Sequence, residues 1–393
     1  RNGMFANSLY PLSTFAPDVQ DLYIAMTVRW LERTNTVTGL RYADDPAVAY
    51  VELHNEADIF FYGIDRLVRL YPSYEEHMNE RFAGWLAKKY KDDAGLAEAW
   101  GDGLKRGESI AEKSIFPFQG FRGPMPAPQH VVDRYTFLYE YQNEFYDRYV
   151  EAIRQTGYQG CIVSGCWQAS DMYGHLLNIA SDRRAGFIDR HNYFKGERPM
   201  LTEPGSALLS AGMQQVGDRP FGLTEWAGGH VWGAECQPVL GLIGLGLNGW
   251  DYSAQFASSS SIVLPDNNGQ INGNFDELRA TGQHPFIARF LYSGALKEGA
   301  NVGSRRISME ELYAGNVGFE ERFSLLGGAN LKTFEGSVPN EALGAGRVTI
   351  DIVDKPVDPK VEMSNLGKYW DREKKVIRAS NGQIVWDLSL IHI

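Results

Sequence analysis

Residues 45–56 read DPAVAYVELHNE and predict a buried β-strand that ends in three polar residues. The run over residues 47–53 is short, apolar and contains β-branched side chains, which is typical of a parallel strand covered on both faces. Residues 18–34, which precede it, place apolar side chains near a period of 3.6 and predict an amphipathic helix. The polar side chains that follow the strand would stand at its carboxyl end: His54, Asn55 and Glu56.

Further strand-like runs alternate with helical patterns along the chain. These runs are residues 160–165, residues 186–193, residues 220–225 and the short Gly249-Trp250-Asp251. Residues 57–158 hold mostly helical patterns, and residues 238–247 predict a shorter helix. This alternation predicts βαβ units and a parallel sheet. After about residue 300 the chain changes to short β-like runs with turn signals between them, which predicts a second, β-rich domain.

Polar and aromatic side chains gather at the predicted carboxyl ends of the strands, which is the active-site face of a (β/α) barrel. The candidate site residues are Asn55, Glu56, Trp167, His191, Tyr193, Glu225, Trp226 and Trp250. Because alternate residues of a strand share a face, Asp189 is expected to point the same way as His191 and Tyr193. The same rule places Phe221, Leu223 and Glu225 on one face of their strand.

Two carboxylates at strand ends, with aromatic residues around them, suit glycoside hydrolysis. One carboxyl group must donate a proton to the leaving oxygen, and the other must attack the anomeric carbon or activate water against it. Glu56 and Glu225 are the candidates for these roles. Aromatic faces stack on the apolar faces of sugar rings, and Trp residues lie at the predicted ends of three strands.

These segments resemble clan A, the large clan of retaining (β/α)8 glycoside hydrolases. Residues 45–56 are similar to its fourth strand, which ends in Asn-Glu, and His191-Asn-Tyr193 resembles the end of its sixth. The run FGLTEW, residues 221–226, is similar to its seventh strand, and Gly249-Trp250-Asp251 looks like its eighth. The helical pattern over residues 85–101 resembles β-galactosidase-like members of the clan.

The resemblance implies a double-displacement mechanism and a role for each candidate residue. Glu225 would be the nucleophile and Glu56 the general acid and base, with the two carboxyl groups about 5–5.5 Å apart. Glu56 would stay protonated near neutral pH while Glu225 stays ionised. Asn55 would hydrogen-bond a sugar hydroxyl, and Tyr193 would orient Glu225. The residues expected to line the pocket are His191, Trp167, Trp226 and Trp250.

The resemblance also implies an α/β fold built as an incomplete (β/α)8 TIM barrel. Strands four to eight would be present and strands one to three missing, so we expect a fragment cut at both ends. Residues 1–300 would form the partial catalytic domain, with residues 57–158 as a helical insertion. Residues 301–393 would form an incomplete β-rich domain at the C-terminal end.

Composition argues against several classes of partner, and the resemblance implies a carbohydrate substrate. The net charge of −11 argues against nucleic-acid and anionic-membrane partners, which call for a basic patch. No run of about 20 apolar residues predicts a membrane span. The proposed chemistry requires no metal and no organic cofactor. The three cysteines are expected to be reduced core thiols. The compartment and the oligomeric state stay open.

Three alternatives stay open from the sequence. The first is another polysaccharide hydrolase of the same clan, such as a β-agarase, cellulase or mannanase. The second is a non-catalytic carbohydrate-binding protein on the same scaffold, although binding alone requires neither Glu56 nor Glu225. The third is a misassembled fragment, because a barrel without its first strands has an open sheet edge.

Overall fold

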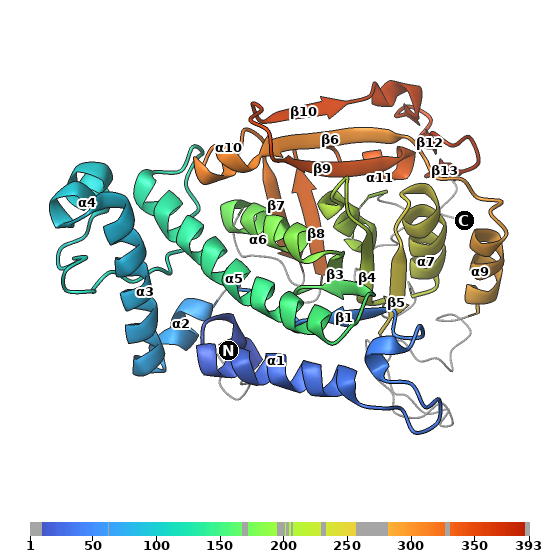
Figure 1. The fold of residues 1–393 in the computed structure, drawn as a ribbon. Coiled ribbons are helices and arrows are strands. Elements are labelled where there is room, and N and C mark those ends of the chain that lie inside the picture. Colours follow the sequence, from blue (N-terminus) through green and yellow to red (C-terminus); the bar gives the residue numbers. More distant parts are fainter. Residues whose placement is uncertain are drawn as a thin grey trace. The chain divides into compact units, whose positions relative to one another are not determined.

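The computed structural model shows a mixed α/β fold that divides into two compact units (Figure 1). Unit 1 comprises Arg1–Phe187 and Met309–Val317, and unit 2 comprises Ile188–Ser308 and Gly318–Ile393. The structure describes residues 10–61, 63–166, 172–194, 201, 204–205, 207–228, 233–256, 282–326 and 331–389. In these ranges the strands pair into separate small sheets rather than one closed barrel.

Unit 1 contains a parallel pair of strands. β1 (Tyr50–Glu52) pairs with β2 (Cys161–Val163), and backbone hydrogen bonds continue the ladder from Leu53 to Val163 and from His54 to Ser164. Both strands were predicted by the sequence, but β1 begins later than expected. The side chain of Asp45 accepts a hydrogen bond from Ala47 N, which makes a turn of residues 45–48 and delays the strand.

Helices form most of unit 1. Those expected over residues 18–34 and within residues 57–158 are confirmed, whereas the helices of this unit after residue 158 were not predicted. The helices of unit 1 are α1 (Pro17–Glu32), α2 (Ile64–Arg69), α3 (Pro72–Tyr90), α4 (Asp93–Trp100), α5 (Gln129–Gln155), α6 (Met172–Ala185) and α10 (Met309–Tyr313). Short 3₁₀ turns lie at Tyr10–Thr14, Tyr42–Asp44 and Gly101–Gly103. The long α5 packs against α1 and α6 (Figure 1). It contributes Phe145, Tyr146 and Tyr149 to a core cluster that also contains Leu53 and Ile162.

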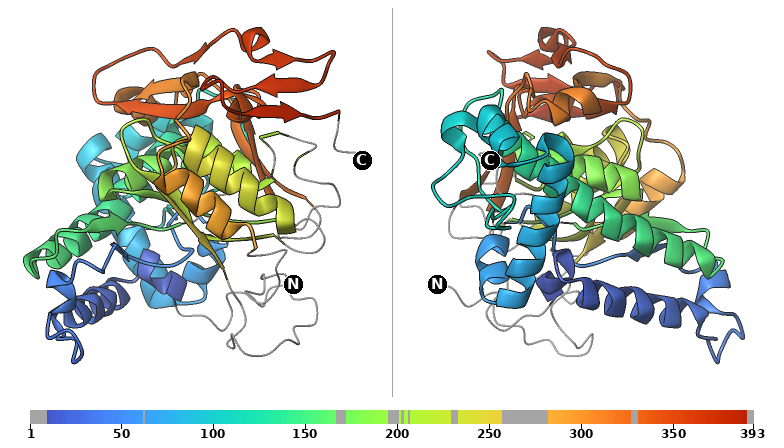
Figure 2. Two further views of the ribbon diagram at one scale, coloured as in Figure 1. Left: turned by 90° about the vertical axis from the view of Figure 1, so that its right-hand side faces the viewer. Right: turned by 60° about the vertical axis from the view of Figure 1, so that its left-hand side comes forward.

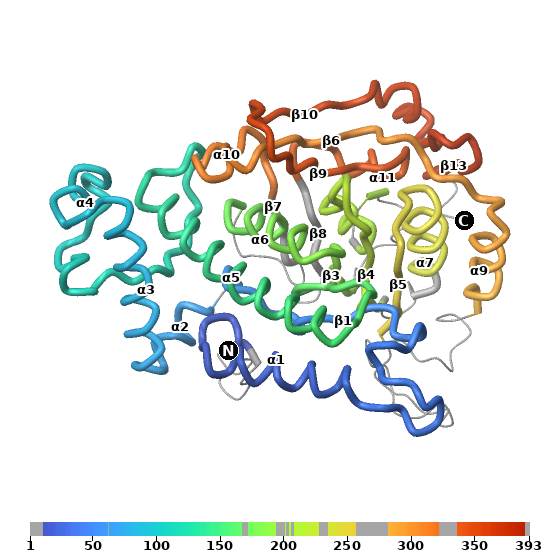
Figure 3. The backbone as a smooth tube through the Cα atoms, in the orientation of Figure 1, coloured from blue at the N-terminus to red at the C-terminus, as the bar shows by residue number. Residues whose placement is uncertain are grey.

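A buried carboxylate ties the helical insertion together. The Asp133 side chain, on α5, accepts hydrogen bonds of 2.6–2.8 Å from Lys89 Nζ, Tyr90 Oη, Trp100 Nε1 and Gln129 Nε2. These donors come from α3, α4 and α5, which follow one another along the tube of Figure 3. A carboxylate with no exposed surface is tolerated because several donors, one of them charged, replace its water.

Unit 2 is built around a parallel sheet in the order β3-β4-β5. The strands are β3 (Ile188–Phe194), β4 (Phe221–Gly228) and β5 (Tyr252–Gln255). The 3₁₀ segment η5 (Ala207–Gln214) lies between the first two strands. Helix α7 (Gly233–Pro238) and the π-helical η7 (Val239–Leu247) lie between the last two, and α9 (His284–Tyr292) follows. The predicted alternation of parallel strands and helices is therefore confirmed here.

The remainder of unit 2 is rich in β-structure (Figure 2). The central strand β6 (Asn301–Ser308) pairs with β9 (Arg347–Val353) and β10 (Lys360–Met363). β7 (Glu321–Leu326) pairs with β8 (Leu331–Gly336), and β11 (Trp370–Asp371), β12 (Val376–Arg378) and β13 (Val385–Asp387) form a third sheet. The short helix α11 (Ala342–Ala345) and the 3₁₀ turn η8 (Leu366–Lys368) complete it. The status of residues 301–393 as a separate domain stays a prediction.

Two expectations from composition can be compared with the structure. Among the described helices, none combines the length and the apolar character that crossing a membrane requires. All three cysteines are free thiols, but only Cys166 and Cys236 are buried, whereas Cys161 is exposed. The expectation of core thiols is therefore wrong for Cys161, which is the first residue of β2.

Candidate active site

In unit 1 the carboxyl end of β1 continues into a strained turn that carries Asn55 and Glu56. The backbone of Glu56 has φ +45°, in the left-handed region that non-glycine residues rarely adopt. Its N–H donates a hydrogen bond of 3.1 Å to Cys166 Sγ, and Cys166 Sγ lies 3.9 Å from Asn55 Oδ1. Asn55 is exposed and Glu56 half-buried. Residues held in such a conformation are concentrated at functional sites.

His54 supports this turn from the interior of unit 1. Its side chain is buried between two hydroxyl groups, with Nε2 3.0 Å from Tyr146 Oη and Nδ1 3.4 Å from Ser13 Oγ. Burial lowers the pKa of His54 to about 4, because the charged imidazolium would lose its hydration there. His54 is therefore neutral at physiological pH and acts as a packed hydrogen-bonding group.

This pKa predicts a pH-dependent stability. The unfolded chain binds a proton at His54 below pH 6.5, whereas the folded chain does so only near pH 4, so stability falls as the pH drops between these values. From pH 7 to pH 5 we expect His54 to account for a loss of about 2 kcal/mol in the free energy of unfolding. Urea titrations of the wild type and His54→Gln at both pH values measure it. Equal losses in the two proteins would contradict the prediction.

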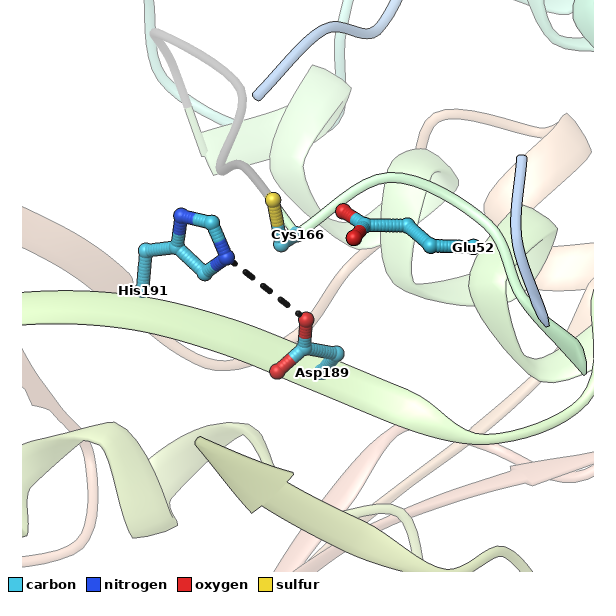
Figure 4. A group of neighbouring side chains, drawn as sticks. All are labelled: Glu52, Cys166, Asp189 and His191. Atoms are coloured by element: carbon cyan, nitrogen blue, oxygen red, sulfur yellow. Dashed lines mark ion pairs between the residues drawn. The ribbon is translucent and has the colours of Figure 1, made fainter. Parts of the chain in front are cut away.

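In unit 2 the strand β3 aligns three polar side chains on one face of the sheet. Asp189 pairs with Gly222 of β4, and His191 pairs with Glu225. Tyr193, two residues further on, shares this face. The expectation that Asp189, His191 and Tyr193 point together is therefore consistent with the register. Asp189 and His191 are seen near each other in Figure 4, with His191 Nε2 3.8 Å from Asp189 Oδ2.

The neighbouring strand β4 contains a β-bulge, which the sequence did not predict. From the pair Asp189–Gly222 to the pair His191–Glu225, β3 advances by two residues and β4 by three. The pairing of β4 with β5 shifts between Leu223 and Trp226. One extra residue therefore lies in β4 at Thr224–Glu225. A bulge places two successive side chains on the same face and re-aims the strand. The expectation that Phe221, Leu223 and Glu225 share a face is wrong for this reason.

The bulge brings Glu225 to the polar face, where two donors hold its carboxylate. The Tyr193 hydroxyl donates a hydrogen bond to Oε1, and His191 Nδ1 lies 3.1 Å from Oε2. The Glu225 side chain keeps 18% of its surface exposed, so the carboxylate is oriented and still accessible. Donors on both oxygens stabilise the ionised form of a carboxylate. Within unit 2 this is a carboxylate held in place at the bulge of a parallel strand, three residues before that strand ends at Gly228.

Beneath Glu225, the extra residue Thr224 joins Asp189 to His191. The Asp189 carboxylate accepts a hydrogen bond of 2.8 Å from Thr224 N and a second from the Thr224 hydroxyl. His191 Nε2 lies 3.1 Å from Thr224 Oγ1. Burial raises the pKa of Asp189, and the nearby His191 and the Thr224 hydrogen bonds partly offset that rise. A continuous chain of polar contacts therefore runs from Asp189 to Glu225.

A family comparison matches the region that carries these side chains. The family model of glycoside hydrolase family 42, described as β-galactosidase, matches residues 21–239, more than half of the chain. The chain belongs to this family. The expected resemblance to β-galactosidase-like glycoside hydrolases is thereby confirmed. No curated protein matches this family 42 chain.

Several solved glycosidases are similar to parts of this family 42 chain. Gan42B, a family 42 β-galactosidase, shares 12% identity at a TM-score of 0.46, over 86% of this chain and 48% of its own. A β-galactosidase from the haloarchaeon Halorubrum lacusprofundi shares 22% sequence identity at a TM-score of 0.33, over 54% of this chain and 30% of that protein. An exo-β-agarase shares 16% sequence identity at a TM-score of 0.36, over 55% of this chain and 27% of that protein. The chain thus spans less than half of each of these proteins.

Two tryptophans expected to line the pocket of this family 42 chain lie elsewhere. Trp226 follows Glu225 in β4 and pairs with Gln255 of β5, so its side chain points to the opposite face of the sheet. There its Nε1 donates a hydrogen bond of 2.8 Å to Ser253 Oγ. It is 2% exposed. Trp250 precedes β5 instead of ending a strand, is 4% exposed, and packs its ring 5.1 Å from that of Phe221. Trp167 lies outside the described residues.

Sequence reasoning missed Thr224 and Cys166 as neighbours of the candidate carboxylates of the family 42 chain. Thr224 was expected on the opposite face from Glu225, because strict alternation leaves no room for an extra residue. A bulge of this kind needs no glycine, so the sequence gives no signal for it. Cys166 was treated as a packing thiol, and only the structure places its sulfur on the backbone N–H of Glu56.

Proposed function

We propose that this family 42 protein hydrolyses β-glycosidic bonds with retention of configuration, and that Glu225 is its nucleophile. The observation that carries the proposal is the Glu225 carboxylate, held by Tyr193 and His191 at the bulge of a parallel strand and still accessible. A nucleophilic carboxylate must be ionised, oriented and open to the substrate. Tyr193 and His191 are proposed to orient it by donating to its two oxygens.

Glu56 is proposed as the general acid that protonates the leaving oxygen and then, as base, activates water. Its exposure and its place after a parallel strand support this assignment, as does the constrained turn held by Cys166. A retaining pair requires about 5–5.5 Å between the Glu56 and Glu225 carboxyl groups. Asn55, exposed beside Glu56, is proposed to hydrogen-bond a hydroxyl of the reacting sugar. The chemistry invokes no metal and no organic cofactor.

The finer fold assignment belongs to the same proposal. We infer that β1, β2, β3, β4 and β5 correspond in order to strands four to eight of a TIM-barrel glycosidase. Parallel pairing of β1 with β2 and of β3 with β4 and β5 supports this order. In such barrels the active site lies at the carboxyl ends of the strands. Glu56 follows β1, and Glu225 lies in the second half of β4, which agrees with this assignment.

The test is hydrolysis of a panel of aryl β-glycosides, with ¹H NMR of the first sugar released. We expect at least one substrate to be cleaved and the β-anomer to appear first, before mutarotation. If the α-anomer appeared first, the mechanism would be inverting instead of retaining. An inverting mechanism requires the two catalytic carboxyl groups to lie about 6.5–9.5 Å apart. Sugar binding without cleavage of any substrate would favour the carbohydrate-binding alternative.

A further inference from the structure

The chain of contacts behind Glu225 constrains where its protons lie. Each link joins two groups that cannot both offer lone pairs, so every contact needs one hydrogen. Asp189 accepts from Thr224 N, and its second oxygen shares a hydrogen with Thr224 Oγ1. Thr224 Oγ1 shares another with His191 Nε2, and His191 Nδ1 shares a third with Glu225 Oε2.

Counting these hydrogens leaves two arrangements when Glu225 is ionised. In the first, Thr224 donates to an Asp189 carboxylate, and His191 is an imidazolium that donates from both nitrogens. In the second, Asp189 is protonated and donates to Thr224, Thr224 donates to a neutral His191, and Nδ1 keeps its hydrogen. The two differ only by a proton shifted across the Thr224 hydroxyl. In both, His191 Nδ1–H faces Glu225.

We infer that Thr224 is a positioning residue whose hydroxyl relays one proton between Asp189 and His191, so that His191 Nδ1 always offers a hydrogen to Glu225. The inference rests on the proposed function in so far as Glu225 is the nucleophile. The relay itself is defined by the contacts within unit 2. Thr224 is available for it because the bulge places Thr224 and Glu225 on the same face of β4.

The relay suits a carboxylate whose charge changes during the reaction. When Glu225 forms an ester with the anomeric carbon, its negative charge disappears and an imidazolium beside it loses its counterion. The proton on His191 Nε2 then passes to Thr224 Oγ1 while the Thr224 proton passes to Asp189. No proton enters or leaves the network, and the buried positive charge disappears. When water releases the sugar, the same shift runs backward.

Among the described residues of unit 2, the strand register places the following titratable groups around His191. Asp189, Tyr193, Glu225 and Tyr252 share its face of the sheet by register, and Arg190 lies on the opposite face. Burial raises the pKa of Asp189, so its carboxylate is able to accept the network proton when the charge of Glu225 disappears. Because these sites interact strongly, an observed alkaline titration belongs to the network rather than to His191 alone.

Three variants separate a relay from a packing role. Thr224→Val keeps the shape and removes the hydroxyl, and Thr224→Ser restores the hydroxyl. In Asp189→Asn the amide oxygen still accepts from Thr224 N, and the amide nitrogen donates to Thr224 Oγ1, which imitates protonated Asp189. Thermal melting of each variant establishes that it is folded.

The first readout needs no activity: ¹⁵N NMR of the imidazole nitrogens, with His191 assigned from His191→Gln. We expect a hydrogen on Nδ1 at pH 7 in the wild type, Thr224→Ser and Asp189→Asn. In Thr224→Val, Nδ1 keeps this hydrogen for Glu225, but Nε2 has no hydroxyl partner, and we expect the Nε2 hydrogen of the imidazolium to be lost at a pH lower by about one unit or more than in the wild type. A wild-type His191 with Nδ1 unprotonated at pH 7 would overturn the inference, whether or not the chain hydrolyses glycosides.

The second readout is the pH profile of kcat/KM on the best aryl glycoside. The alkaline limb is expected to move to lower pH in Thr224→Val, to stay in Thr224→Ser, and to move upward in Asp189→Asn, which has no network proton to lose. Shifts of opposite sign are not expected from packing defects. Limbs that stay in place in all variants would refute the relay, whereas inactivity of every protein with the expected NMR result would refute only the proposed function.

Discussion

Replacing Glu225 by alanine is expected to lower kcat/KM for aryl β-glycosides by about 10⁴-fold or more, because no other group forms the covalent intermediate. The hydroxyl of Tyr193 and the imidazole of His191 would remain, but they hold only the carboxylate and cannot attack carbon. Initial rates of release of the aryl group measure the loss. Glu225→Gln, which keeps the shape, is expected to fall equally.

Azide separates loss of the nucleophile from general damage. The truncated side chain leaves room on the face where Glu225 stood, so azide is expected to attack the anomeric carbon and restore turnover. The product would be a glycosyl azide of inverted configuration, because a single displacement replaces the double one. Glu362→Ala, an exposed carboxylate on β10, is the control and should keep wild-type rates. Wild-type activity in Glu225→Ala would refute the assignment.

Replacing Glu56 by alanine is expected to give a loss that depends on the leaving group. General acid catalysis contributes about 10²–10⁴-fold, and it matters most when the departing oxygen is basic. Glycosides of simple phenols should therefore lose about 10³-fold in kcat/KM, whereas dinitrophenyl glycosides, whose leaving group needs no proton, should lose much less. The slope of rate against phenol pKa measures the difference.

The same variant also differs from Glu225→Ala in its response to azide. With Glu225 intact, the glycosyl-enzyme still forms, and azide attacks it from the side that Glu56 vacates. The glycosyl azide is then expected to have retained configuration. Asn55→Ala, next to Glu56, should lower kcat/KM for all substrates by the same factor and leave the slope of rate against phenol pKa unchanged. A uniform loss in Glu56→Ala would assign Glu56 to binding instead of proton transfer.

The sequence predicted those parts of the fold that follow from periodicity. α1 and α5 have apolar side chains at helical spacing, and the β-prone segments of β3 and β4 alternate with helical patterns along the chain. Strand ends were harder to place. Asp251 N donates to Phe221 O and Asp251 Oδ2 accepts from Phe221 N, so Trp250 and Asp251 lead into β5 at the amino end of β4.

The sequence indicated side chains that do lie together in the structure, but it did not predict how they are arranged. Glu225, His191 and Tyr193 do lie together in unit 2. Trp226 was expected beside them because aromatic rings bind sugars, but a one-residue change of register decides which face a side chain occupies. That register depends on backbone pairing with β3 and β5, which the order of side chains along β4 does not encode.

The amide of the extra residue has a consequence for folding. Thr224 N–H donates to Asp189, a side chain of the neighbouring strand. Straightening the strand would turn Glu225 inward and Trp226 outward, leaving a buried carboxylate without its donors. Asp189 therefore helps to fix the register of β3 with β4. When this hydrogen bond forms, the sheet has its native alignment and Thr224 lies beside Asp189 and His191. Slow hydrogen exchange of the Thr224 amide would show that this hydrogen bond is formed, and therefore that Asp189, Thr224 and Glu225 are in their native positions.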